Sequence, residues 1–273
     1  MSSVVYSTSQ LSIIRGEKHL LKDVSVDIEQ GKVTVILGSN GAGKSTFLGV
    51  LAGDIDPDQG NVTFLDRDIR DWSTRALAEQ RSVLPQQTLL QFAFRAREVV
   101  AMGRLPLPPD TPENERAAID RSMARTETSH LAERSFPQLS GGEQSRVSFA
   151  RVLAQETPVV LLDEPTASLD LRHQHDLMTV AKDIAAAGGT VVAIVHDINL
   201  ACTYADTLLL FDQGEMVATG SPWDVVRNDV LQRTFGCPMA VMNHPYLNCP
   251  LVLSTDNART RLPGERAATL PIS

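Results

Sequence analysis

The chain has 273 residues, of which 42% are hydrophobic and 21% charged, a composition that excludes global disorder and allows a large folded core. Its formal net charge of −8 argues against a general nucleic-acid-binding protein, whose affinity comes from clustered Lys and Arg. No apolar run approaches the roughly 18–20 residues that span a bilayer, and residues 1–20 contain no apolar signal core. With three cysteines and no CxxC pair, we expect free thiols and a soluble cytosolic protein.

Short strands and turns dominate the first third of the chain. Alternating or continuous apolar residues predict strands over 11–16, 24–28 and 32–38, and the third runs directly into a glycine-rich loop. The elements predicted next are a helix over 45–53, a turn at 56–60, a strand over 61–69, a Ser/Thr-capped helix over 73–81 and a strand from Ser82 into a polar loop.

The middle of the chain is predicted to be helical. Helical spacing covers 97–105 and 113–136, and a proline-rich connection at 105–114 joins the two segments. Because strand-bearing segments lie on both sides, we interpret 89–155 as a separate helical lobe inserted into a core made of 1–88 and 156–240.

Strands and helices alternate again from Thr157 onward. Strands are predicted over 158–164, 190–197, 207–214 and 217–220, and helices over 169–187, 198–206 and 222–236. This alternation predicts an α/β fold with a mainly parallel sheet covered on both faces. Residues 241–273 form a C-terminal extension, polar from about Ser254.

A phosphate-binding loop is predicted between the strand over 32–38 and the helix that follows it. The sequence GSNGAGKST fits the G-x-x-x-x-G-K-[ST] pattern, in which Lys44 neutralises phosphate charge and Ser45 ligates Mg²⁺. The alternative, a glycine-rich turn that only caps a helix, is disfavoured by the order strand, loop, helix. The predicted nucleotide-binding residues are Gly38, Ser39, Asn40, Gly41, Ala42, Gly43, Lys44, Ser45 and Thr46.

Two adjacent carboxylates end the buried strand VVLL. Neighbouring side chains on a strand point in opposite directions, so Asp163 is expected to face hydrated Mg²⁺ and Glu164 a water that attacks the γ-phosphate. An acidic turn in which Asp163 caps a helix is the alternative. His196 ends the next buried strand and Gln86 follows an earlier one. Taken alone, His196 would be interpreted as structural and Gln86 as solvent-facing. Their common sheet edge makes both of them candidate phosphate or water contacts.

A second phosphate cradle is predicted at LSGGEQSRV, where Ser140, Gly141 and Gly142 precede a helix and no lysine is present. Two other clusters are interpreted as non-functional. His173 and His175 are taken as solvated surface residues, and 244–249 contains His, Tyr and Cys without the spacing of a metal or haem site.

The order of these motifs resembles the nucleotide-binding domain of ATP-binding-cassette (ABC) transporters over residues 4 to 240. The resemblance implies a P-loop NTPase of ABC type, with a mainly parallel core, an antiparallel β subdomain and an inserted helical lobe. It also implies that two copies pair head-to-tail, each ATP lying between the loop at 38–46 of one copy and Ser140, Gly141, Gly142 and Glu143 of the other.

The same resemblance implies roles for single residues. Glu164 is the catalytic base, His196 contacts the γ-phosphate, and Gln86 senses both Mg²⁺ and the membrane partner, while Asp170 communicates across the dimer. Residues 89–103 receive a permease. One departure concerns adenine recognition, because Arg15 stands where many family members have an aromatic residue, and we expect it to stack on the base.

Further similarity, in 82–87, 92–106 and 244–253, is to ATP-binding subunits of importers for iron chelates, haem and cobalamin, and most of all to those for haem. We therefore expect an ATPase subunit of a bacterial haem importer, peripheral on the cytoplasmic face of the inner membrane, that meets an extracytoplasmic binding protein only indirectly. Siderophore or cobalamin uptake is the first alternative. An exporter subunit and a soluble ABC protein are further alternatives. The former is often fused to its membrane spans, and the latter usually carries two cassettes, a coiled coil or zinc-binding inserts.

Overall fold

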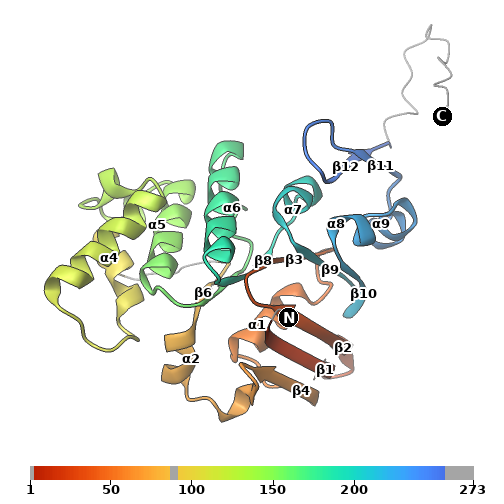
Figure 1. Cartoon of the computed structure of the whole chain (residues 1–273), viewed down its shortest axis with the longest axis horizontal. Helices are drawn as coiled ribbons and strands as arrows, with labels where there is room; N and C mark the ends of the chain where they lie inside the picture. The colour runs from red at the N-terminus through yellow and green to blue at the C-terminus, as the bar shows by residue number, and fades with distance from the viewer. Residues whose placement is uncertain (1–2, 87–91, 256–273) are drawn as a thin grey trace, which may run out of the picture.

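A six-stranded sheet lies at the centre of the computed structural model, which describes residues 3–86 and 92–255 (Figure 1). Its strand order is β10-β9-β3-β8-β7-β6, and all neighbours pair in parallel except β10, which is antiparallel to β9. The strands are β3 (Val33–Gly38), β6 (Arg81–Leu84), β7 (Val159–Leu162), β8 (Thr190–Ile194), β9 (Thr207–Asp212) and β10 (Glu215–Gly220). The predicted α/β class with a mainly parallel sheet is confirmed.

Both faces of this sheet are covered, which explains why its strands are continuously apolar. Every residue of β3, β7 and β8 is buried. Val35 packs into one apolar cluster and Ile36 into the other, as alternate residues of a strand must. The helices of the core are α1 (Lys44–Ala52), α2 (Thr74–Gln80), α6 (Leu171–Ala186), α7 (Ile198–Tyr204), α8 (Pro222–Val225) and α9 (Asn228–Phe235), with the 3₁₀ turn η1 (Ile69–Asp71).

A second, antiparallel sheet packs beside α1 (Figure 1). Its order is β2-β1-β4-β5, and the strands are β1 (Val4–Arg15), β2 (Lys18–Glu29), β4 (Gln59–Phe64) and β5 (Arg67–Asp68). Tyr6 of β1 is fully buried and stacks on Phe64 of β4 with ring centroids 4.6 Å apart. Its side chain belongs to the same apolar cluster as Phe47 of α1, so this sheet is fixed to the helix that follows the phosphate-binding loop.

Helices α3 (Ala96–Ala101), α4 (Pro112–Arg125) and α5 (Gly141–Ala154) form what we call the helical lobe, which has an apolar cluster of its own. The 3₁₀ turns η2 (Met102–Arg104), η3 (Ser129–Leu131) and η4 (Phe136–Gln138) lie between these helices. Helix α5 belongs to both units. Val147 and Ala150 pack within the lobe, whereas Phe149 and Val152 pack into the core cluster around α6.

Four expectations about elements were wrong. The strand expected over 61–69 is broken into β4 and β5 at Leu65 and Asp66, which have positive φ values, and it is followed by η1. The helix expected over 113–136 ends at Arg125, because Glu127 adopts a positive φ of 53° and the Thr126 hydroxyl bonds back to the carbonyl of Ser122. The helix expected over 222–236 is split into α8 and α9, since Val226 and Arg227 have non-helical backbone angles. An antiparallel hairpin of β11 (Met239–Asn243) and β12 (Pro250–Ser254), which begins two residues before the expected extension, was missed.

The remainder of the expected extension, residues 256–273, lies outside the described residues. The three cysteines, Cys202, Cys237 and Cys249, are free. None of the helices within 3–86 and 92–255 combines the length and apolar character that a bilayer crossing requires.

Tyr6 generates a stability prediction. Its hydroxyl is buried without a hydrogen-bond partner among the described residues, and burial raises the pKa of this phenol. Since an unpaired buried hydroxyl costs about 1–3 kcal/mol, Tyr6→Phe is expected to raise the free energy of unfolding by roughly 1 kcal/mol in a chemical denaturation experiment.

Tyr204→Phe is the matched control, because the Tyr204 hydroxyl lies 3.0 Å from Nδ1 of His175. Loss of that hydrogen bond is expected to lower the free energy of unfolding by about 1 kcal/mol. Equal destabilisation by the two substitutions would contradict the prediction for Tyr6.

Candidate functional site

The carboxyl ends of the parallel strands meet at one edge of the central sheet, and several of the predicted site residues lie there. Gly38 ends β3, Asp163 and Glu164 follow β7, His196 follows β8 and Gln86 follows β6. Ligands of open α/β sheets bind at this edge. The topology therefore gathers side chains from four separate parts of the chain.

Glycines give the phosphate-binding loop its shape. Gly41 and Gly43 have positive φ values of 76° and 98°. A Cβ on Gly43 would lie 2.5 Å from the carbonyl oxygen of Leu20, so there is no room for a side chain. Gly43 is the N-cap of α1 and contributes no side-chain cap, which leaves the first N–H groups of the helix available to an anion.

Lys44 lies inside this loop with only 5% of its surface exposed. Its ammonium group donates to the carbonyl oxygens of Gly38 at 2.9 Å and Ser39 at 2.8 Å. Burial lowers the pKa of Lys44, and the carboxylates of Glu164 and Asp163 oppose that shift. A phosphate group entering the loop would therefore meet a positive charge that the backbone has already positioned.

Asp163 and Ser45 form the part of the site that suits a magnesium ion. The Ser45 hydroxyl donates to Oδ1 of Asp163 at 3.2 Å. Burial raises the pKa of Asp163, while the Ser45 hydrogen bond lowers it. A hydroxyl and a carboxylate beside a phosphate-binding loop are the oxygen donors that Mg²⁺ prefers, so these residues fit the ion.

The Glu164 carboxylate has different partners from the Asp163 carboxylate. Its Oε2 accepts from Nε2 of Gln86 at 2.8 Å, and its Oε1 lies 2.7 Å from Nε2 of His196. The backbone of Glu164 has a positive φ of 50°, a conformation that costs a non-glycine residue about 1–2 kcal/mol. The carboxylate is thus oriented by two side chains and by its own backbone.

The segment predicted as a second phosphate cradle is built differently. Ser140 is the N-cap of α5 and accepts from the N–H of Glu143 at 3.3 Å, while the N–H of Ser140 donates to Oε2 of Glu143 at 2.8 Å. These bonds lower the pKa of Glu143. Gly141 shares a pocket of about 250 Å³ with Asp163 and Glu164. Among the described residues, no hydrogen bond or ion pair joins the cradle to the loop at 38–46.

Two glutamines that the sequence reasoning missed hold the turns on either side of this pocket. Nε2 of Gln144 donates to the carbonyls of Phe136 and Leu139, and Nε2 of Gln174 donates to those of Thr166 and Leu169. Each glutamine stands four residues after a helix N-cap, a spacing that could have signalled its role.

Asp170 is the N-cap of α6 and accepts from the N–H of His173 at 3.0 Å. The same Oδ1 lies 2.8 Å from Nδ1 of His173, and these contacts lower the pKa of Asp170. Arg15 ends β1, where its guanidinium pairs with Asp58 at 3.1 Å. The adenine contact of Arg15 stays a prediction.

The interpretation of His173 and His175 as solvated surface residues was wrong. Both are partly buried, because His173 bonds Asp170 and Nδ1 of His175 lies 3.0 Å from the Tyr204 hydroxyl. Of the segment expected to receive a permease, residues 89–91 lie outside the described part. The remainder begins with the exposed side chain of Phe92 and continues into α3.

Comparisons with known proteins agree with this geometry. A family model described as "ABC transporter" matches residues 21–167. The chain is 43% identical over 259 residues to the hemin import ATP-binding protein HmuV of Rhodococcus jostii, covering 94% of this chain and 88% of the relative. The same-named protein of Gloeobacter violaceus is 46% identical over 257 residues, with 91% and 94% covered.

Solved structures of ABC transporters and their cassettes are also similar to this chain. A metal-chelate type ABC transporter in an inward-facing conformation superposes with a TM-score of 0.79 at 25% identity, covering 94% of this chain and 99% of that chain. A dimeric ATP-binding cassette bound to ADP and Pi superposes with a TM-score of 0.73 at 27% identity, covering 79% and 98%.

The loop glycines generate a paired prediction. In Gly43→Ala the new methyl group would meet the Leu20 carbonyl, so the substitution is expected to lower the free energy of unfolding by more than about 2 kcal/mol and to weaken nucleotide binding. Gly41→Ala is the control, since its Cβ would meet nothing within 4 Å. Its cost is limited to the positive φ, about 1 kcal/mol. Equal losses in denaturation experiments would contradict the steric explanation.

Proposed function

This chain belongs to the ABC transporter family, and we propose that it is the ATP-hydrolysing subunit of an importer for haem. The observation that carries the enzymatic part is the Glu164 carboxylate, held between Gln86 and His196 beside a complete phosphate-binding loop. A carboxylate with this support at the phosphate end of the sheet is suited to accept a proton from an attacking water.

The residues divide the work of hydrolysis among them. Backbone N–H groups of 41–46 and the Lys44 ammonium bind the phosphates, and Glu164 takes the proton of the attacking water. His196 orients Glu164 through a contact of 2.7 Å and would contact the γ-phosphate. Ser45, Asp163 and Gln86 would hold Mg²⁺, whose chemistry is to neutralise charge developing on the phosphate oxygens.

The working unit of this proposal is a head-to-tail pair of chains. The chain is similar to cassettes solved as dimers. The cradle at Ser140–Glu143 offers a capped helix N-terminus without a lysine, so it suits an anion whose charge Lys44 of the other copy already balances. Asp170 would lie near the contact between the copies.

We place the protein peripherally on the cytoplasmic face of the bacterial inner membrane, with residues 89–103 against a permease dimer and an extracytoplasmic binding protein as an indirect partner. The division into a core of 1–88 and 156–240, a helical lobe of 89–155 and an extension of 241–273 is part of this proposal. Movement of the lobe relative to the core would pass the state of the nucleotide to the permease.

The cargo is inferred from relatives named for hemin import, which the chain matches at 43% and 46% identity over most of its length. Ferric siderophores and cobalamin are the alternative cargoes, because the similar transporter structure is described only as metal-chelate type. An exporter subunit and a soluble ABC protein are the further alternatives.

Glu164→Gln is expected to lower ATP turnover at least about 100-fold, because the amide cannot accept the water proton, while ATP-dependent dimerisation is kept. Steady-state phosphate release and size-exclusion chromatography with ATP measure the two effects. Glu133→Gln, at an exposed ion pair with Arg95, is the control and is expected to hydrolyse ATP normally. Normal turnover by Glu164→Gln would remove Glu164 as the base.

The cargo assignment is tested in the assembled transporter. With the permease and its binding protein in vesicles, haem-loaded binding protein is expected to stimulate ATP hydrolysis and to release haem into the lumen that corresponds to the cytoplasm. A ferric siderophore and cobalamin are the comparison ligands. Stimulation by one of these and not by haem would replace the cargo and leave the ATPase assignment intact.

A further inference from the structure

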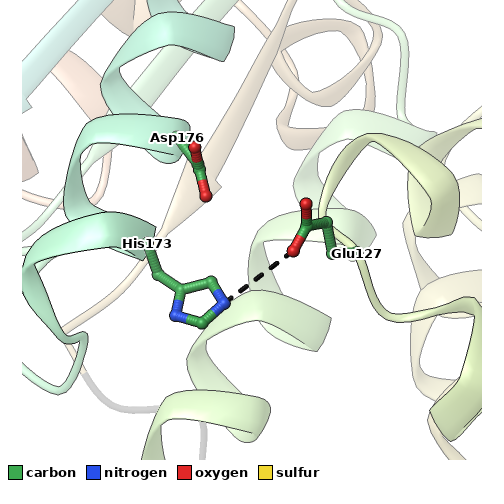
Figure 2. Close-up of side chains that lie close together, drawn as sticks. All are labelled: Glu127, His173 and Asp176. Carbon is green, nitrogen blue, oxygen red and sulfur yellow. Dashed lines mark ion pairs between the residues drawn. The ribbon is translucent and has the colours of Figure 1, made fainter.

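Three potential metal ligands, none of which is among the predicted nucleotide-site residues, converge between the helical lobe and α6 (Figure 2). Glu127 follows α4, and His173 and Asp176 stand one turn apart on α6. One ligand atom from each residue lies within 4.8 Å of the other two. Figure 2 shows the Glu127 carboxylate facing the imidazole ring across the space between the two elements.

The imidazole of His173 is oriented as in metal sites. Oδ1 of Asp170 lies 2.8 Å from Nδ1, so this nitrogen donates its proton to the carboxylate. The lone pair of Nε2 then faces Glu127, whose Oε2 is 3.9 Å away. Histidine ligands of metals characteristically donate their other ring N–H to a carboxylate, which fixes the tautomer and raises the basicity of the ligand.

A small cavity lies at the same point. Its volume is about 20 Å³, and Glu127, His173 and Asp176 are all in its lining. A cavity of roughly 10–15 Å³ on this scale already holds one water molecule. The space is therefore sufficient for a single ion.

The carboxylates beside the cavity attract a cation, and the Arg172 guanidinium already occupies them. Nη2 of Arg172 donates to the two Glu127 oxygens at 2.8 and 2.9 Å, and its Nε lies 3.5 Å from Asp176. The Arg172 side chain is 68% exposed, so it can leave without disturbing the core. Arg125 and Arg146 also line the cavity, and Arg146 is occupied by the backbone carbonyls of Thr126 and Glu127.

We propose that Glu127, His173 and Asp176 bind one divalent transition-metal ion of the zinc class, which displaces Arg172 and joins the helical lobe to α6. One imidazole and two carboxylates match a zinc site that keeps a fourth position for water, whereas Mg²⁺ and Ca²⁺ favour oxygen ligands alone. Bonds of about 2.0–2.2 Å place ligand atoms roughly 3.4 Å apart, so ligand atoms now up to 4.8 Å apart must approach by up to about 1.4 Å. This site is independent of the proposed haem cargo.

The test uses the full-length chain without nucleotide, titrated with CoCl₂ and then with ZnCl₂. We expect one Co²⁺ per chain, with the visible absorption of a four-coordinate nitrogen–oxygen site, and its displacement by Zn²⁺. His173→Gln removes a metal ligand. It is expected to weaken Co²⁺ binding at least as much as the loss of a group that only hydrogen-bonds a ligand, which costs roughly 10–100-fold. Arg172→Ala removes the competing cation and is expected to tighten binding about fivefold.

His175→Gln is the matched control, because it makes the same substitution two residues away, where the ring contacts Tyr204. Its Co²⁺ affinity is expected to be unchanged. If His173→Gln fails to fold, Asp176→Asn at an exposed position must show the same loss. The proposal is overturned if neither the natural chain nor Arg172→Ala binds Co²⁺, if binding survives in His173→Gln, or if the spectrum shows thiolate ligation.

Discussion

Parallel pairing of five strands is the constraint on which the rest of the structure depends. Because β9, β3, β8, β7 and β6 run in one direction, all five end at the same edge of the sheet. The residues at the ends of these strands therefore become neighbours, although Gly38 and His196 are 158 positions apart along the chain. Coverage on both faces keeps the strands dry and leaves this edge open to a charged ligand.

The fold and the phosphate loop could be predicted because their signals are local. Buried strands are continuous apolar runs, and GSNGAGKST needs only a strand before it and a helix after it. His196 and Gln86 could be placed at the same sheet edge because each follows a strand, but their contacts with Glu164 could not be predicted. Contacts that depend on packing were out of reach, as shown by His175, whose Nδ1 lies 3.0 Å from the hydroxyl of Tyr204 on another helix. The break after Arg125 was missed because its cause is the left-handed backbone of Glu127.

The phosphate-binding loop and the predicted second cradle at Ser140 differ in how their charge is arranged. The loop at 38–46 holds a buried ammonium on two backbone carbonyls, whereas the helix at Ser140 has its own glutamate in the capping box and an arginine, Arg134, 3.2 Å from that glutamate. The first supplies a full positive charge to a ligand, and the second supplies only N–H groups and the helix dipole. This asymmetry suits two surfaces that share one nucleotide.

Helix α5 has a mechanical consequence because it packs into two apolar clusters. Its 14 residues span about 21 Å as a straight rod, with Gly141 at one end and Ala154 at the other. Gln144 fixes the turn before the helix to its first turn, so Ser140 moves with the rod. A displacement of the lobe also moves side chains in the core, since Phe149 and Val152 of α5 would shift against the core cluster. How tightly Phe149 and Val152 pack against the core cluster therefore determines how far Ser140 moves when a force acts on the lobe.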